Sequence, residues 1–286
     1  MSPSPPGPAP TRLAYFEDTY LTSIATKVQS VERLDPPAGA DAPALPTYAI
    51  VLDATVAYPA GGGQPSDTGR IVPSPSDDAG SSSSSAFVVR EARMLRDGRV
   101  EHVGEFLEEG AAPLEPGAEV TVAIDADRRL LHARVHSAGH LLDVAMTAVG
   151  FGPKILAPAK GLHGADQAYV EYAGKVEGLD KEKLMEDLRR EMRALVARGG
   201  ASAAEEMAYA DAARACGGEL PPYVSADATP RVVTILPDTE GCPCGGTHVR
   251  DVAEIGDCDV VGVRVKKGVT RVSYTIEGMK DHAKRA

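Results

Sequence analysis

The sequence has no long apolar run, no N-terminal stretch typical of a secretory signal and few cysteines, and each of these features argues against a class of protein. No apolar run approaches the roughly 20 residues that a membrane-spanning helix needs. The N-terminal stretch MSPSPPGPAPTR has no basic start followed by an apolar core, so we expect no secretory signal. The 4 cysteines are then expected to be reduced thiols or metal ligands rather than a disulfide framework, which predicts a cytoplasmic protein.

An excess of positive charge is also absent. The chain has 30 Lys and Arg against 41 Asp and Glu, which gives a net charge of −11. This balance argues against a protein that coats nucleic acid non-specifically, but it does not exclude a local basic patch. The length of 286 residues favours two domains of modest size.

The pattern of residues divides the chain into three parts. Residues 1–12 are rich in proline and are expected to form a disordered tail. Residues 13–126 alternate β-forming residues with turn residues, which predicts a small β-barrel domain with a serine-rich insertion at residues 74–85. Residues 127–286 mix helical and strand patterns. The predicted fold class is therefore α+β, with a sheet covered by helices in the second domain.

Two amphipathic helices are expected in the second domain, at residues 128–149 and 179–197. In the first, apolar side chains recur three and four residues apart, which places them on one helical face. These apolar positions are Leu131, Val135, Ala138, Leu142, Ala145 and Val149. The pattern returns to strands between residues 232 and 276.

Histidine and cysteine side chains gather in two short segments. His136 and His140 are four apart and would share one face of the first helix, although His132 has the same spacing from His136. Cys244 and His248 frame the sequence CGGTH, whose two glycines permit a tight loop, while Cys242 competes with Cys244 as a ligand. Three imidazoles and one thiolate form a ligand set that zinc accepts, so the sequence predicts a zinc site.

These segments carry a resemblance to a known family. HSAGHLL followed far downstream by CGGTHV resembles the HxxxH…CxxxH signature of the editing domain of alanyl-tRNA synthetase, the second additional domain shared with threonyl-tRNA synthetase. The free-standing relatives of this domain are the AlaX-type trans-editing proteins. YPAGGGQPSDTG, GTHVRDVAEIG and RVKKGVTRVSYTI also resemble family motifs, and together the motifs cover most of residues 13–278.

The resemblance implies a zinc-dependent hydrolase that cleaves the ester of mischarged tRNA(Ala), typically seryl and sometimes glycyl. It assigns zinc to His136, His140, Cys244 and His248, and it leaves His132 and Cys242 as non-ligands. Bound zinc could activate a water or position the substrate. A site with four protein ligands resembles a closed structural centre, so the sequence leaves this choice open and identifies no general base.

Further side chains are candidates for contact with the substrate. Ser137 and Thr247 adjoin metal ligands, but a helical serine can equally bond to its own backbone and Thr247 can simply fill a turn. The GGGQ stretch could bring backbone amides close to a substrate, or it could form a plain β-turn. Residues 157–172 occupy the place of the family's amino-acid pocket but depart from its pattern. The predicted substrate-binding residues are Gly61, Gly62, Gly63, Gln64, Ser137, Lys160, Gly161, His163 and Thr247.

The C-terminal region reverses the overall negative charge. Between residues 260 and 286 the basic residues are Arg264, Lys266, Lys267, Arg271, Lys280, Lys284 and Arg285, against Glu277 and Asp281. A basic end is often only solubilising, but a tRNA ligand requires cations for its phosphates. We expect Lys266, Lys267 and Arg271 to contact the acceptor end of tRNA(Ala), and we expect a monomer that has no membrane partner.

Two other functions fit parts of the sequence. The chain could be a binding module for tRNA or protein in which zinc only holds the structure together. It could also be a zinc hydrolase for an unusual aminoacyl-tRNA or a free small molecule, which the divergent residues 157–172 would suit. A metalloprotease is excluded, because HSAGH lacks the glutamate that the HExxH pattern uses as its general base.

Overall fold

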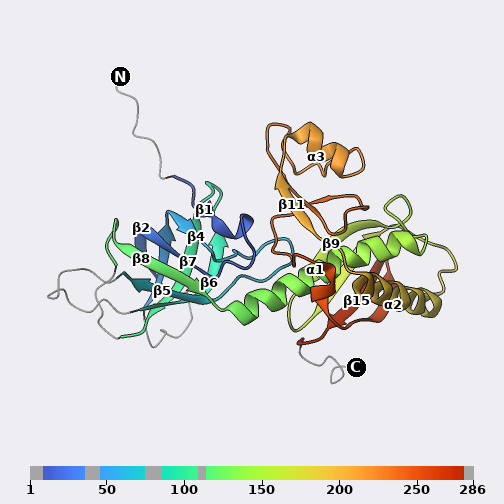
Figure 1. Cartoon of the computed structure of the whole chain (residues 1–286), viewed down its shortest axis with the longest axis horizontal. Helices are drawn as coiled ribbons and strands as arrows, with labels where there is room; N and C mark the ends of the chain where they lie inside the picture. The colour runs from blue at the N-terminus through green and yellow to red at the C-terminus, as the bar shows by residue number, and fades with distance from the viewer. Residues whose placement is uncertain (1–8, 36–45, 75–85, 109–113, 280–286) are drawn as a thin grey trace. The chain divides into compact units, whose positions relative to one another are not determined.

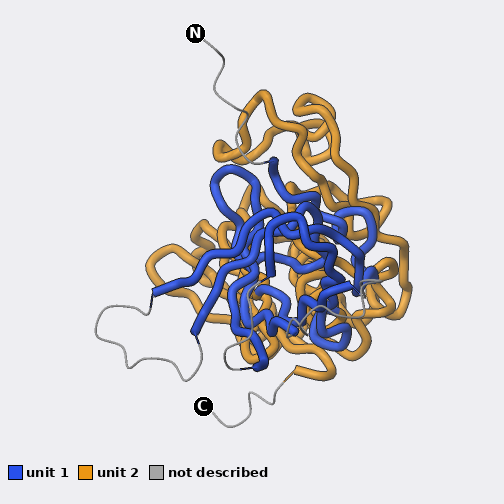
Figure 2. The backbone as a smooth tube through the Cα atoms, turned by 90° about the vertical axis from the view of Figure 1, so that its left-hand side faces the viewer, with its two compact units in different colours: residues 1–60, 66–129 blue, residues 61–65, 130–286 orange. Residues whose placement is uncertain are grey.

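The computed structural model describes residues 9–35, 46–74, 86–108 and 114–279 (Figure 1). The chain divides into two compact units (Figure 2). Unit 1 comprises Met1–Ala60 and Ser66–Arg129, and unit 2 comprises Gly61–Pro65 and Leu130–Ala286. Gly61–Pro65 therefore belong to unit 2, although they lie within the stretch that the sequence assigned to the first domain. Most of the predicted tail and of the serine-rich insertion falls outside the described residues.

Unit 1 is built around a closed six-stranded barrel, which confirms the predicted barrel. Its strands follow the order β2-β3-β7-β6-β5-β8, and all the pairings are antiparallel. Alternating side chains point inward along these strands and fill the interior, as a small barrel requires. The strands are β2 (Ser23–Leu34), β3 (Thr47–Leu52), β5 (Gly69–Pro73), β6 (Phe87–Met94), β7 (Val100–Phe106) and β8 (Glu119–Ile124).

Short elements and three buried polar side chains complete unit 1. Strands β1 (Arg12–Leu13) and β4 (Ala54–Thr55) pair in parallel, and a 3-10 turn, η1, spans Ala14–Phe16. The buried Asp67 and Arg129 form an ion pair, with Arg129 Nε 3.0 Å from Asp67 Oδ2. The buried His102 lies within hydrogen-bonding distance of the Ile50 carbonyl and of the Thr55 hydroxyl.

Unit 2 contains a four-stranded antiparallel sheet in the order β14-β15-β10-β9. Helices α1 and α2 share one hydrophobic core with this sheet, so the predicted α+β class is confirmed. Helix α1 begins in unit 1 and continues into unit 2. These elements are α1 (Ala126–Ala148), β9 (Ala157–His163), β10 (Ala168–Ala173), α2 (Lys181–Arg198), β14 (Cys258–Lys266) and β15 (Val269–Ile276).

A smaller three-stranded sheet, in the order β11-β12-β13, lies in the same unit. It consists of β11 (Ala203–Glu206), β12 (Arg231–Thr234) and β13 (Cys242–Pro243), with α3 (Tyr209–Ala215) inserted between its strands and η2 (Val252–Ile255) after them. Because β13 leads directly into residues 244–248, this sheet holds one of the two predicted ligand segments in place.

The helix boundaries follow from local chemistry. The apolar face of α1 buries Val135, Ala138, Leu142 and Ala145, as the three- and four-residue spacing predicted. Asp180 caps the start of α2 by accepting a hydrogen bond from Lys183 N at 3.0 Å. Within the described ranges, none of the helices combines the length and the apolar character that a membrane crossing requires.

Candidate metal centre

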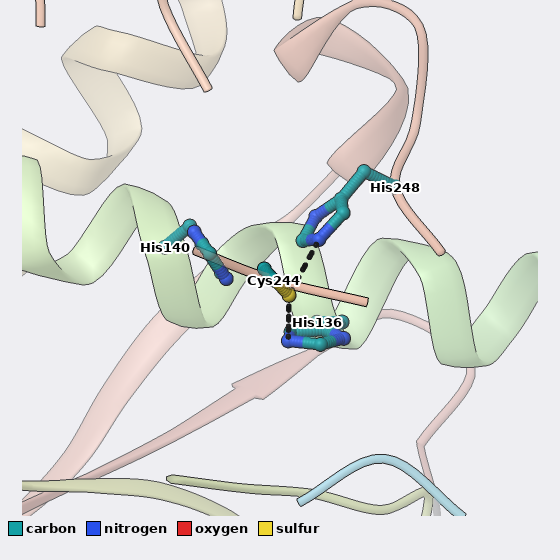
Figure 3. Close-up of side chains that lie close together, drawn as sticks. All are labelled: His136, His140, Cys244 and His248. Carbon is teal, nitrogen blue, oxygen red and sulfur yellow. Dashed lines mark hydrogen bonds between the residues drawn. The ribbon is translucent and has the colours of Figure 1, made fainter. Parts of the chain in front are cut away.

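Four side chains of unit 2 converge in the arrangement drawn in Figure 3. His136 and His140 project from adjacent turns of α1, and Cys244 and His248 come from the loop after β13. One ligand atom from each residue lies within 4.8 Å of the other three. The cluster contains neither His132, one turn earlier on α1, nor the exposed Cys242.

Two separations between ligand atoms in the cluster fit a tetrahedral ion. Cys244 Sγ lies 3.5 Å from His136 Nε2 and 3.4 Å from His248 Nε2. Zinc bonds of about 2.3 Å to sulfur and about 2.0 Å to nitrogen, at a tetrahedral angle, separate such ligand atoms by about 3.5 Å. These distances agree with a group of four side chains that could hold a metal ion.

Burial keeps the three imidazoles neutral, which is the form that binds a metal. Burial and the neighbouring imidazoles lower the pKa of His136 and that of His248 well below the ordinary range. Burial lowers the pKa of His140 to about 4. Burial also raises the pKa of the Cys244 thiol, so its thiolate form requires a nearby cation.

Gln64 orients the first ligand. Its Oε1 accepts a hydrogen bond from Thr247 N at 3.1 Å and lies 2.8 Å from His136 Nδ1. Its Nε2 donates to Thr247 Oγ1 at 2.9 Å, which fixes the amide orientation. An oxygen can only accept, so His136 Nδ1 carries the proton and His136 Nε2 presents its lone pair toward Cys244.

Ser137 orients a second candidate ligand, His248. Its hydroxyl accepts a hydrogen bond from Val249 N at 3.1 Å and lies 3.3 Å from His248 Nδ1. His248 Nε2 is thereby turned toward Cys244. The side chains of Gln64, Ser137 and Thr247 are thus engaged with the ligand segments, and their predicted contact with substrate stays a prediction.

Arg231 is a residue that the sequence analysis missed. It is buried on β12, and its Nη1 donates to Cys244 O at 2.8 Å and to Gly246 O at 3.0 Å. These bonds hold the CGGTH loop against the sheet. Gly246 is required in this loop because a Cβ there would overlap the His136 ring. No local motif marks Arg231, since its contacts arise only from the pairing of β12 with β13.

The segment around β9 borders the centre through His163. His163 is buried, and its ring stacks on His136 with a centroid distance of 4.4 Å and an interplanar angle of 16°. Its backbone N donates to Gly63 O at 2.8 Å, which brings part of the GGGQ stretch to β9. Burial and the neighbouring His140 lower the pKa of His163 to about 3. Gly61, Gly62 and Lys160 are exposed, whereas Gly161 is partly buried.

Asp143 is a second residue that sequence reasoning missed. It lies one turn beyond His140 on α1 and accepts a hydrogen bond from the Tyr172 hydroxyl at 2.7 Å. Burial raises the pKa of Asp143 to about 7, although the bond from Tyr172 opposes this shift. A carboxyl group that titrates near neutrality is an acid–base candidate. The three-residue offset from His140 was the available signal.

The predicted tRNA-binding side chains have different surroundings. Lys266 and Lys267 are exposed at the turn between β14 and β15, where Lys267 has a φ of 52°. Arg271 is instead paired with Glu171, through bonds of 2.9 Å and 2.6 Å, and lies 3.9 Å above the centre of the Tyr169 ring. The candidates Lys280, Lys284 and Arg285 lie outside the described residues.

The fold and the cluster define a two-unit α+β protein with a candidate His₃Cys metal centre. Residues 231–273 match the family model described as threonyl and alanyl tRNA synthetase second additional domain. Known proteins match over more of the chain. An alanyl-tRNA editing protein AlaX-M of Pyrococcus horikoshii is 30% identical over 255 residues, which are 86% of this chain and 88% of that protein.

Two further relatives are similar to most of this chain. The AlaX-M of Methanosarcina barkeri is 30% identical over 93% of this chain and 99% of its own length. An alanine–tRNA ligase of Methanothrix thermoacetophila is 32% identical over 79% of this chain but only 23% of the ligase. The chain belongs to the AlaX-M family of alanyl-tRNA editing proteins.

Proposed function

We propose that this protein is a trans-acting hydrolase that removes a wrong amino acid from tRNA(Ala), with Ser-tRNA(Ala) as the main substrate and Gly-tRNA(Ala) as a second one. The observation that carries the proposal is the His₃Cys cluster, because its Cys244 and His248 lie within the matched editing-domain segment. Relatives of similar length are named alanyl-tRNA editing proteins, which supports action on this tRNA.

We further propose zinc as the metal of the cluster. The N₃S ligand set and the 3.4 Å and 3.5 Å separations between ligand atoms support this choice. Zinc, when bound, would supply Lewis acidity at this cluster. His136, His140, Cys244 and His248 would hold it, while Gln64 and Ser137 keep His136 and His248 in the ligating orientation.

We assign the other predicted site residues either to contacts with the aminoacyl group or to contacts with the tRNA. We assign Gly63, Gly161 and His163 to the wall beside the cluster, since Gly63 and His163 share a backbone hydrogen bond. Gly61, Gly62 and Lys160 are exposed and could meet the terminal nucleotide. Lys266 and Lys267 would contact phosphates of the acceptor end. Arg271 is less suited to this role, because Glu171 already offsets its charge.

The test is hydrolysis of a panel of radiolabelled aminoacyl-tRNAs by the purified protein. The panel contains Ser-, Gly- and Ala-tRNA(Ala), with Ser-tRNA(Ser) and Thr-tRNA(Thr) as specificity controls and a Cys244→Ala variant alongside. We expect rapid loss of Ser-tRNA(Ala), slower loss of Gly-tRNA(Ala) and no loss of Ala-tRNA(Ala). If the zinc-loaded protein cleaves no member of the panel, the proposal fails and a tRNA-binding module or an unusual substrate takes its place.

A further inference from the structure

His163 is a buried imidazole beside the metal cluster that the ligand set does not use. Its side chain stacks on the ligand His136, and only 5% of the residue is exposed. Its two ring nitrogens have different environments. Nδ1 lies 2.6 Å from the Tyr274 hydroxyl, whereas Nε2 makes no hydrogen bond with the described residues.

The hydrogen bonds of Tyr274 fix which nitrogen carries the proton. The Tyr274 hydroxyl has a single hydrogen and donates it to the Val135 carbonyl at 2.9 Å. The same oxygen must therefore accept the bond from His163, so the proton lies on His163 Nδ1. In the neutral ring, Nε2 then carries an unshared electron pair and can only accept a hydrogen bond.

Glycines surround this ring on several sides. A Cβ at Gly161 would overlap His163 Nε2, a Cβ at Gly139 would lie 2.8 Å from the Tyr274 hydroxyl, and a Cβ at Gly63 would lie 3.2 Å from the His163 ring. The chain thus leaves no side chain at 161 to cover Nε2. By contrast, the polar atoms of Gln64 and Ser137 are engaged with ligand segments.

We propose that His163 Nε2 is a specificity determinant that accepts a hydrogen bond from the side-chain hydroxyl of the seryl group. This inference rests on the proposed function. An alanyl or glycyl group has no side-chain donor and leaves the buried acceptor unpaired. Sites built to hydrogen-bond a substrate hydroxyl reject analogues that lack it for this reason. The α-ammonium group is common to all three aminoacyl groups, so a bond to it would not discriminate between them.

Two variants separate this role from a structural one. His163→Phe keeps an aromatic ring on His136 but removes the acceptor. Tyr274→Phe leaves His163 in place but removes the oxygen that holds the proton on Nδ1, so Nε2 can become a donor. Tyr48→Phe in unit 1 is the matched control for the loss of a phenolic hydroxyl. For each variant, kcat/KM is measured on Ser-tRNA(Ala) and Gly-tRNA(Ala), and the metal content is determined.

We expect His163→Phe to lower kcat/KM for Ser-tRNA(Ala) by about 10- to 100-fold, as for one hydrogen bond to a buried acceptor. Activity on Gly-tRNA(Ala) should change less than about threefold, at an unchanged metal content. Tyr274→Phe should lower the seryl preference in the same direction, and Tyr48→Phe should preserve it. Nitrogen-15 NMR of the histidine side chains should find Nδ1 protonated and Nε2 unprotonated in the wild type, and a shift of this balance in Tyr274→Phe.

Equal losses on both substrates would overturn the inference, as would a proton on Nε2 in the wild type. If the His163→Phe protein loses its metal, the Tyr274→Phe variant provides the test. An unchanged preference of Tyr274→Phe for Ser-tRNA(Ala) over Gly-tRNA(Ala) would then overturn the proposed role of His163 Nε2. These outcomes differ from failure of the proposed function, in which the wild-type protein itself cleaves neither substrate.

Discussion

Gln64 Oε1 lies 2.8 Å from His136 Nδ1, so a residue of the GGGQ stretch fixes the orientation of a candidate metal ligand. Replacing Gln64 with Ala removes this acceptor, so no side chain at position 64 holds His136 Nδ1 in the ligating orientation. We expect metal affinity to fall about 10- to 100-fold, as for other outer partners of ligating histidines. Competition with a chromophoric chelator measures the effect. Gln167→Ala, at an exposed glutamine of the same unit, should bind metal like the wild type.

Loss of a candidate metal ligand should lower metal affinity more than loss of the side chain that is hydrogen-bonded to a ligand. We expect His140→Ala to lose bound zinc and deacylation together, because the cluster is then one donor short of its tetrahedral N₃S set. Elemental analysis and the hydrolysis assay test this in parallel. Cys242→Ala is the control, since Cys242 is exposed and outside the cluster, and it should keep both metal and activity. An active, zinc-loaded His140→Ala protein would overturn the ligand assignment.

Asp67 lies in the same glycine-rich motif as Gln64 but supports unit 1. The side chains of Asp67 and Arg129 are 0% and 2% exposed, so Asp67→Asn leaves a buried guanidinium without its counter-charge. The free energy of unfolding should fall by about 3–5 kcal/mol. Glu105→Gln breaks a pair whose Arg90 side chain is 65% exposed, and it should lower stability by less than about 1 kcal/mol. Urea unfolding compares the two, and similar losses would contradict the argument.

His102 should make unit 1 sensitive to acid. Burial lowers the pKa of His102 to about 4, whereas the unfolded chain should protonate it near pH 6.5. As pH falls from 6.5 to 4, the unfolded state gains a proton that the folded state does not take. The free energy of unfolding therefore decreases, by on the order of 3 kcal/mol from this group.

Comparison with His102→Asn isolates this contribution, because the other buried histidines are present in both proteins. The Asn amide can still donate to the Ile50 carbonyl, which lies 3.0 Å from Nδ1 in the wild type. The difference in unfolding free energy between the two proteins should vary across pH 4–6.5 and stay constant at higher pH. A difference that is constant throughout would show that His102 titrates normally in the folded protein.

Lys266 and Lys267 provide a test of the tRNA surface. Each phosphate contact contributes about 0.7–0.9 to the slope of log affinity against log salt. We expect the double Lys→Ala variant to reduce the magnitude of this slope by up to about 1.8, for two lost contacts. The catalytic rate at saturating tRNA should not change. Lys27→Ala, in unit 1, should keep the wild-type slope, and an unchanged slope in the double variant would remove these residues from the interface.

Local sequence patterns predict those features that depend on residues close together in the chain. Alternation predicts the barrel, and apolar spacing predicts the buried face of α1. The spacing of histidines gives the pair on one helical face. Residues far apart in the chain could not be placed in this way. Gln64 meets His136 across 72 residues, Arg271 meets Glu171 across 100, and His163 meets Tyr274 across 111.

Such contacts depend on sheet register and loop closure, which no short window of sequence encodes. Arg271 illustrates the consequence, because its register partner on β10 is Glu171. The predicted contact between Arg271 and tRNA could not take this pairing with Glu171 into account. The family resemblance could select His136 and His140 over His132, but it carried no information on Asp143, Arg231 or the protonation of His163.

The separation of the ligand segments also bears on synthesis of the chain. Thr247 reaches back 183 residues to Gln64, and Cys244 lies 108 residues after His136. A nascent polypeptide that stops before residue 244 carries His136 and His140 but neither Cys244 nor His248. Products that stop before this point therefore lack a complete ligand set, which exists only once residue 248 has been translated.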